Sequence, residues 1–127
     1  MNLSIHQNRR ERLLTLIPDN SVVLVPAAVE LTRSRDTEYP FRQDSDFFYL
    51  TGFNEPDALL ILSKDNSGNT ASLLLCRPKD QLAEIWQGRR LGPEQAKAVL
   101  GLDALPIAEL DTELLTALNQ KTTLVYS

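Results

Sequence analysis

Short runs of aliphatic residues recur along the chain, at residues 21–25, 58–62 and 71–76. Each run is too short for a typical helix and lacks polar alternation, a pattern that predicts strands buried on both faces. Residues 65–69 read Asp-Asn-Ser-Gly-Asn and are strong turn formers, so we expect the second and third runs to pair as a hairpin. Shorter apolar runs predict further strands at residues 105–107 and 122–126.

Amphipathic segments between these runs predict helices. The first covers residues 4–17, where Ser4 and Gln7 have the spacing of a capping box and an apolar stripe follows. The second follows Gly92-Pro93, because proline is favoured at the first position of a helix, and the third has Asp111 as its cap. Strands that are apolar on both faces need cover on both faces. The sequence therefore predicts an α/β fold, a mixed β-sheet with helices on both faces.

Aromatic residues are concentrated in one stretch. Six of the eight lie within residues 39–53, interleaved with charged and polar side chains. We expect residues 47–51 to form a strand that ends at Gly52, and Asp44 and Asp46 would then lie on one face of an extended segment. A paired-carboxylate site there remains open beside the simpler interpretation of a turn and strand entry.

The composition restricts the chemistry. The chain has 127 residues, which is about one domain, with one histidine, His6, and one cysteine, Cys76. A zinc site or a nucleophilic triad needs more such residues than this, and we expect Cys76 to be a small buried apolar residue. No glycine-rich phosphate-binding motif is present.

The charge pattern excludes further classes. A net charge of -4 argues against binding to nucleic acid or to a membrane surface. We interpret the basic run Arg9, Arg10 and Arg12, balanced by Glu11, as a solvated helix face. No apolar run is long enough to span a membrane and no signal-peptide pattern precedes the first helix, so we expect a cytoplasmic protein.

Two blocks of sequence carry a resemblance to a known protein family. Residues 32–58 read TRSRDTEYPFRQDSDFFYLTGFNEPDA, and residues 83–92 read AEIWQGRRLG. Together with the early Arg9-Arg10 helix, they resemble the N-terminal domain of bacterial Xaa-Pro aminopeptidases, the aminopeptidase P family. The resemblance implies a creatinase/aminopeptidase P N-terminal domain-like fold over residues 1–127, truncated before a catalytic pita-bread domain. The strand pattern at the end of the sequence likewise suggests a piece of a longer protein.

The family resemblance also implies how the work is divided between domains. Catalysis would take place in the missing domain, on two manganese ions held by two Asp, two Glu and one His, and would release the N-terminal residue before proline. No residue of this chain is assigned as catalytic or as a metal ligand. The domain would shape substrate access and take part in homo-oligomer assembly, with proline-containing peptides as substrates, and the isolated chain is predicted to be inactive.

Five residues are candidates for this role. Trp86 and Asp36 are predicted to contact substrate or a neighbouring subunit, while Arg42, Asp44 and Arg89 are predicted to support the loops and the interface. Simpler alternatives remain for each: Trp86 could cover its own domain, Asp36 could be a solvated charge, and Arg42 and Asp44 could pair with each other or with the backbone.

Other functions remain open at this point. The chain could be a stand-alone, non-catalytic module for peptide binding or assembly. It could also be the N-terminal domain of a prolidase or creatinase relative, because these share the two-domain plan.

Overall fold

The computed structural model describes residues 3–28, 43–80, 84–85, 90–118 and 123–126. In this part of the chain, one five-stranded sheet has the order β4-β3-β2-β1-β5. Its strands are β1 Ser21–Pro26, β2 Leu59–Lys64, β3 Thr70–Cys76, β4 Asp103–Pro106 and β5 Thr123–Tyr126. β2 is antiparallel to both β1 and β3, whereas β1 pairs with β5 and β3 with β4 in parallel. All the strands except β2 therefore run in the same direction.

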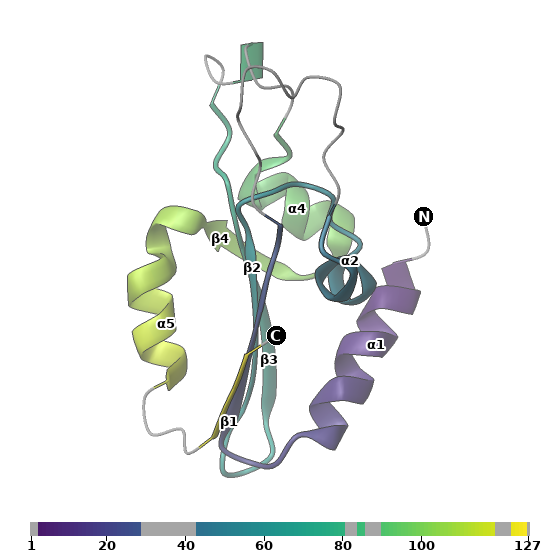
Figure 1. Ribbon diagram of the computed structural model, residues 1–127, viewed down its shortest axis with the longest axis vertical. Helices are drawn as coiled ribbons and strands as arrows, with labels where there is room; N and C mark the ends of the chain where they lie inside the picture. The colour runs from purple at the N-terminus through teal and green to yellow at the C-terminus, as the bar shows by residue number, and fades with distance from the viewer. Residues whose placement is uncertain (1–2, 29–42, 81–83, 86–89, 119–122, 127) are drawn as a thin grey trace.

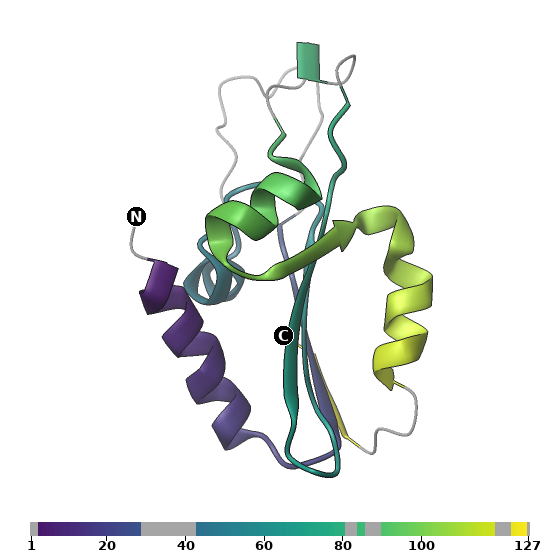
Figure 2. The same ribbon diagram turned by 180° about the vertical axis from the view of Figure 1, so that it is seen from behind.

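Helices cover both faces of this sheet, as Figures 1 and 2 show from opposite sides. One face carries α1 Leu3–Leu16, α2 Ser45–Thr51 and α4 Gly92–Leu100, and the other carries the 3₁₀ helix η1 Ile107–Glu109 and α5 Leu110–Leu118. The predicted fold class, a mixed sheet between helices, is confirmed.

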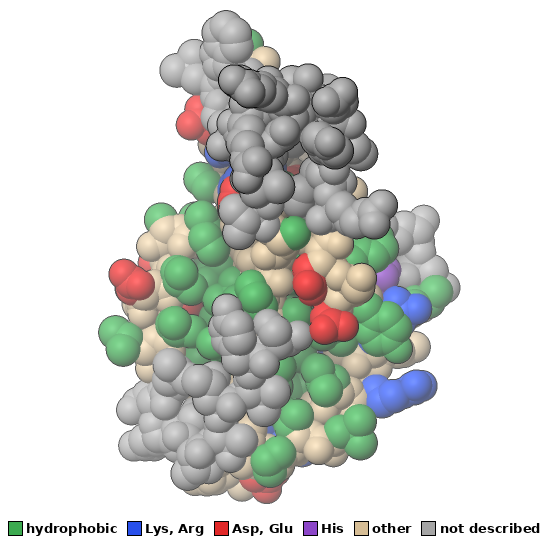
Figure 3. Space-filling model, in the orientation of Figure 1, with side chains coloured by type: hydrophobic (Ala, Val, Ile, Leu, Met, Phe, Trp, Pro, Cys, Tyr) green, Lys and Arg blue, Asp and Glu red, His purple; other side chains and the backbone are tan. Residues whose placement is uncertain are grey.

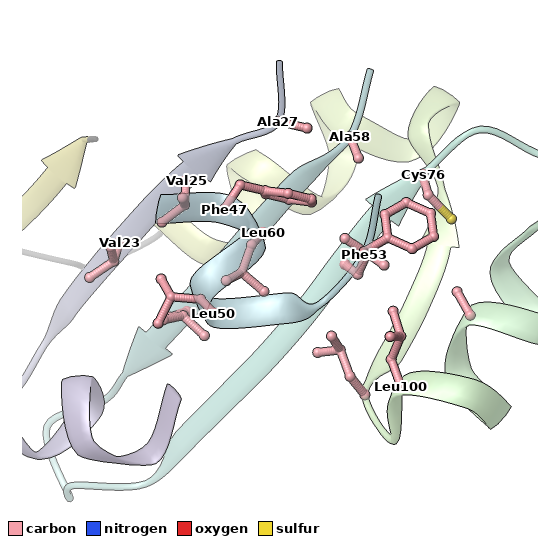
Figure 4. Packing of buried hydrophobic residues seen from close by; sticks show 14 of the residues in the cluster. Val23, Val25, Ala27, Phe47, Leu50, Phe53, Ala58, Leu60, Cys76 and Leu100 are labelled. Atoms are coloured by element: carbon pink, nitrogen blue, oxygen red, sulfur yellow. The ribbon is translucent and has the colours of Figure 1, made fainter. Parts of the chain in front are cut away.

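The aliphatic runs are unbroken because neighbouring residues on a strand point to opposite helix layers. In β2, Leu60 and Leu62 belong to the larger core under α1, α2 and α4, whereas Ile61 packs toward α5. Phe47 projects from α2 onto the sheet beside Leu60 (Figure 4) and is fully buried. Complete burial of a side chain of this size contributes about 1.5–3 kcal/mol relative to leaving it exposed.

The predicted hairpin is confirmed. β2 and β3 pair with Leu59 opposite Leu75 and Lys64 opposite Thr70. At the turn, Asp65 Oδ1 accepts hydrogen bonds from the main-chain N–H groups of Ser67 at 2.8 Å and Asn69 at 2.9 Å. Such bonds from an aspartate to the following backbone explain why the turn residues could be read from the sequence.

Several boundaries differ from the prediction. The strand expected at residues 105–107 begins two residues earlier, at Asp103, and Ile107 already belongs to η1. The last helix begins at Leu110, so Asp111 lies in its first turn rather than at its cap. An acidic residue is still favourable there, because it faces the positive end of the helix dipole.

The strand predicted at residues 47–51 is wrong, because this segment is the helix α2. Asp44 caps it, with Oδ2 accepting a hydrogen bond from Phe47 N at 2.9 Å. Gly52 ends it in the left-handed conformation, φ 72°, and its N–H donates to Phe48 O at 2.8 Å. Asp44 and Asp46 therefore do not share the face of an extended strand. The two caps outweigh the strand preference of three consecutive aromatic residues.

Candidate functional site

The predicted contact residues fall in different parts of the structure. Trp86, Asp36, Arg42 and Arg89 lie outside the described residues, so their roles stay predictions. Asp44 is described, is exposed, and has a backbone partner at the start of α2. The first four residues lie in two stretches, residues 29–42 and residues 78–90, and the described residues at the borders of the two stretches define the site.

Both stretches leave from one end of the sheet. Residues 29–42 follow β1 and residues 78–90 follow β3, and these two strands run in the same direction because each is antiparallel to β2. Their carboxyl ends therefore meet at one edge, the usual location of binding sites in open α/β sheets. The loop of residues 53–58 ends at the same place, because Leu59 at the start of β2 pairs with Pro26 at the end of β1.

The side chain of Gln43 closes the first stretch at its base. Its Oε1 accepts a hydrogen bond from Ala28 N at 2.8 Å, which joins the two residues that flank the stretch, and a second one from Asp44 N at 2.9 Å. Its Nε2 donates to Glu55 O at 2.7 Å and to Phe53 O at 3.3 Å. One carboxamide thus fixes the base of residues 29–42 to the loop before β2.

The carboxylate of Glu55 closes the second stretch. Its Oε2 accepts a hydrogen bond from Leu91 N at 2.7 Å, and its Oε1 lies 3.5 Å from an Arg77 guanidinium nitrogen. The two side chains are only 18% and 11% exposed. Arg77 follows β3 and Leu91 precedes α4, so one half-buried carboxylate contacts both ends of residues 78–90.

A second acidic residue lies within this stretch. Glu84 accepts hydrogen bonds from Arg90 N at 3.0 Å, Asp80 N at 3.2 Å and Lys79 Nζ at 3.3 Å. The main-chain N–H of Arg90, followed by the other two donors, lowers the pKa of the Glu84 carboxyl below its usual value. Hydrogen bonds to the ionised form act in this direction, so the residue is a carboxylate at neutral pH.

Only part of the basic run of α1 forms the solvated face that the sequence suggested: Glu11 and Arg12 are exposed, whereas Arg9 and Arg10 contact α2. Arg10 is only 3% exposed, its guanidinium donates to Leu50 O at 2.8 Å, and burial lowers its pKa. Arg9 donates to Tyr49 O at 3.1 Å, and its guanidinium carbon lies 4.0 Å from the centre of the Tyr49 ring. These cations meet the last carbonyls of α2, where the helix dipole favours positive charge. The contact of Arg9 and Arg10 with the end of α2 was not predicted from the sequence, where the only signal for it is the basic run itself.

An apolar hollow of ≈ 390 Å³ lies between α1, α2 and β1. Its apolar lining includes Leu13, Leu16, Val23, Val25 and Leu50, with Tyr49, which is 52% exposed, at its edge. Figure 3 shows hydrophobic side chains spread over the face between α5 and α1. Arg9, Arg12 and Asp46 also line the hollow, so it can accept apolar groups beside charged ones.

The described residues do not fit a metal centre or a thiol nucleophile. No group of three or more His, Cys, Asp or Glu converges within them. Cys76 is buried, and burial, together with the charge of Glu55, raises the pKa of its thiol to about 11. Among these residues, no helix is long and apolar enough to cross a membrane.

Comparison with known proteins identifies the family of this fold. The family model "Aminopeptidase P, N-terminal domain" matches residues 6–126. The Xaa-Pro aminopeptidase of Escherichia coli (strain K12) is 48% identical over 114 residues, which cover 89% of this chain and 26% of that protein.

Solved structures give the same result. Aminopeptidase P from E. coli with the inhibitor Pro-Leu superimposes with a TM-score of 0.90 at 43% identity, over 99% of this chain and 29% of that one. Proline aminopeptidase P II from Yersinia pestis gives 0.87 at 48% identity, over 98% of this chain and 29% of that one. Fold and sequence together define an aminopeptidase P N-terminal domain. The chain belongs to the Xaa-Pro aminopeptidase family, and it spans about a quarter of the length of the curated relatives it matches.

Proposed function

We propose that this chain is the domain of an Xaa-Pro aminopeptidase that narrows access to the catalytic centre and contributes to subunit assembly. Catalysis takes place in a C-terminal domain that holds two manganese ions, on peptides whose second residue is proline. The match to about a quarter of longer peptidases supports this division.

The observation that carries the proposal is the shared base of two stretches of chain. Residues 29–42 contain Asp36 and Arg42, and residues 78–90 contain Trp86 and Arg89. Gln43 and Glu55 fix both stretches to the loop before β2, at the carboxyl ends of parallel strands. A fixed base supports contacts that must recur at the same place, as in an interface or at the entrance to a site.

Within these stretches, we expect Trp86 to contribute most to the contacts with substrate or a neighbouring subunit. A tryptophan in a glycine-containing, arginine-flanked sequence is typical of an interface anchor. In the assembled enzyme it contacts substrate or a neighbouring subunit. Asp36 pairs with an arginine of the catalytic domain or with the substrate amine, and Arg42, Asp44 and Arg89 support these contacts.

The test uses the full-length protein with Trp86→Ala. We expect KM for a tripeptide with proline second to rise, or subunit dissociation to become easier, by about 30-fold, equivalent to about 2 kcal/mol for a hot-spot residue. Steady-state kinetics and analytical ultracentrifugation measure the two effects. Leu115→Ala is the control, because Leu115 is 73% exposed on α5, on the other face of the sheet. Unchanged KM and unchanged assembly in the Trp86 variant would refute the proposal.

The division between domains has its own test. The purified 127-residue chain, given manganese and an Xaa-Pro peptide, should show no release of the N-terminal residue. The full-length protein should hold two manganese ions per chain by elemental analysis. Turnover by the short chain, or a full-length protein without bound metal that is still active, would contradict this division.

A further inference from the structure

The apolar hollow between α1, α2 and β1 has an exposed leucine at its edge. Its lining includes three leucines over a floor of two valines, Leu13, Leu16, Leu50, Val23 and Val25. Leu16 is 76% exposed, so most of this side chain has no cover within the described part of the chain. A single exposed leucine needs no explanation, but one that adjoins an apolar hollow marks a contact site for another surface.

A second hollow, of ≈ 440 Å³, adjoins the first. It is lined by Gln43, Ser45, Phe48 and Asn54 and by two residues of the first hollow, Arg9 and Tyr49. The two hollows therefore form one continuous surface, which we call the α1–α2 surface. Phe48 and Tyr49 are both exposed on it, and aromatic residues and arginine are enriched at the centres of protein interfaces.

The charges around the first hollow favour a partner with an acidic group. Arg9 and Arg12 contribute two cations to its lining, and Asp46 contributes one carboxylate. Arg9 is held by the carbonyl and the ring of Tyr49, whereas Arg12 is exposed. Complementary charge across an interface gives specificity, so the partner should place a carboxylate against Arg12.

The rest of a longer polypeptide fits this surface as its partner. The chain spans about a quarter of the length of its curated relatives, so most of such a polypeptide lies outside this domain. A covalently attached partner has an effective concentration in about the millimolar range, which favours it over a separate molecule. The path is also short, because β5 lies beside the floor of the first hollow, with Val125 paired to Val23.

We infer that the α1–α2 surface is where this domain docks against the remainder of the longer polypeptide. An apolar side chain of the remainder fills the first hollow, and an acidic residue beside it faces Arg12. The inference rests on the proposed function, because it takes the chain to be one domain of a longer peptidase.

The experiment compares the accessibility of one position in the 127-residue chain and in the full-length protein. Leu16→Cys changes an exposed side chain, so the short chain should keep its fold. A thiol reagent should label this position about tenfold more slowly in the full-length protein, because the centre of an interface excludes water. Peptide mass spectrometry separates this label from any on Cys76.

Leu115→Cys is the control, because Leu115 is 73% exposed on α5, on the other face of the sheet. Its labelling should be equally fast in both proteins. Equal labelling of Leu16→Cys in the two proteins, or an equal slowing at both positions, would overturn the inference. The inference also fails if the slowing disappears once the full-length protein is diluted to monomers, as judged by analytical ultracentrifugation, because the partner is then a second copy.

Arg12 gives a second measurement, which leaves the leucine in place. Arg12→Gln should leave the Tm of the 127-residue chain unchanged, because the side chain is exposed there. In the full-length protein it should lower the temperature at which this domain unfolds by about 3 °C, as expected for the loss of one charge contact. Arg12→Lys keeps the charge and should stay near wild type. An equal shift in both proteins, or no shift in either, would overturn the contact with a carboxylate.

These measurements separate the docking surface from the proposed function. If Trp86→Ala changes neither KM nor assembly while Leu16→Cys is protected in the full-length protein, the proposed function fails and the docking surface stands. If Trp86→Ala raises KM and Leu16→Cys is labelled equally fast in both proteins, only the docking surface fails.

Discussion

Two buried hydrogen bonds of the Thr51 hydroxyl stabilise the end of α2 and the start of the loop that contains Glu55, and their contribution can be tested by mutation. Thr51 is the last residue of this helix and is only 1% exposed. Its Oγ1 donates to Phe47 O at 2.8 Å and accepts from Phe53 N at 3.0 Å. The substitution Thr51→Val keeps the branched shape and removes both hydrogen bonds.

The expected loss of stability follows from the main-chain N–H that loses its acceptor. Without the hydroxyl, the main-chain N–H of Phe53 is buried with no acceptor, and an unsatisfied buried donor costs about 1–3 kcal/mol. At the middle of that range, the Tm of a domain of this size should fall by roughly 5–10 °C. No comparable cavity term applies, because valine nearly fills the same volume.

The assay is urea unfolding followed by circular dichroism, with linear extrapolation to water. Thr116→Val is a matched control. Thr116 Oγ1 donates in the same way to the carbonyl four residues earlier, that of Thr112, at 3.0 Å, but on an exposed face of α5. That variant should stay within about 0.5 kcal/mol of wild type. If the two variants differ by less than about 0.5 kcal/mol, the reasoning from burial is wrong.

Further predictions concern a carboxylate, a glycine and the thiol. The Arg90 N–H lowers the folded-state pKa of Glu84, so the stability that the ionised carboxylate contributes is present at neutral pH and is lost as the pH falls through the folded-state pKa. The difference in unfolding free energy between wild type and Glu84→Gln should therefore shrink from about pH 7 to about pH 3. A difference that stays constant over this range would contradict the prediction. Gly52→Ala should lower the free energy of unfolding in urea by more than Gly101→Ala does. Both glycines have positive φ, which costs about 1–2 kcal/mol for alanine, but a Cβ at Gly52 would lie 2.7 Å from the His6 ring of α1, whereas one at Gly101 meets nothing within 4 Å. Equal losses of stability would refute the contact with His6. Burial raises the pKa of the Cys76 thiol to about 11. At about pH 8 this thiol should therefore react slowly with a disulfide reagent in native buffer and rapidly in urea. Fast labelling of the native protein would argue against the burial of Cys76.

The sheet could be predicted because its signal is local. Runs such as residues 58–62 are apolar on both faces, and the turn at Asp65 carries its own hydrogen-bond acceptor. The error at residues 47–51 is instructive, since the sequence also contained the two ends of a helix. Asp44 and Gly52 stand at the cap positions, so end signals deserved more weight there than the strand preference of Phe47 and its neighbours.

The polar base of the site could not be predicted in the same way. Arg10 finds its acceptor 40 residues along the chain, and Glu55 finds Leu91 36 residues along. Nothing in the neighbouring sequence marks these residues as buried, because charged side chains are usually exposed and their partners here come from other elements. The resemblance of residues 32–58 and 83–92 identified the family, whereas only the folded chain shows that Glu55 of the first block accepts a hydrogen bond from Leu91 of the second.

The parallel pair of β1 and β5 has a consequence for how the protein is made. β1 is among the first elements to leave the ribosome, yet one of its edges pairs with residues 123–126. The hairpin and its neighbours can assemble earlier, because their contacts are closer in sequence. Until residues 123–126 have been made, β1 therefore displays an open strand edge, the kind of surface onto which other chains add. The exposure of β1 ends when β5 pairs with it, and β5 then forms this edge of the described sheet.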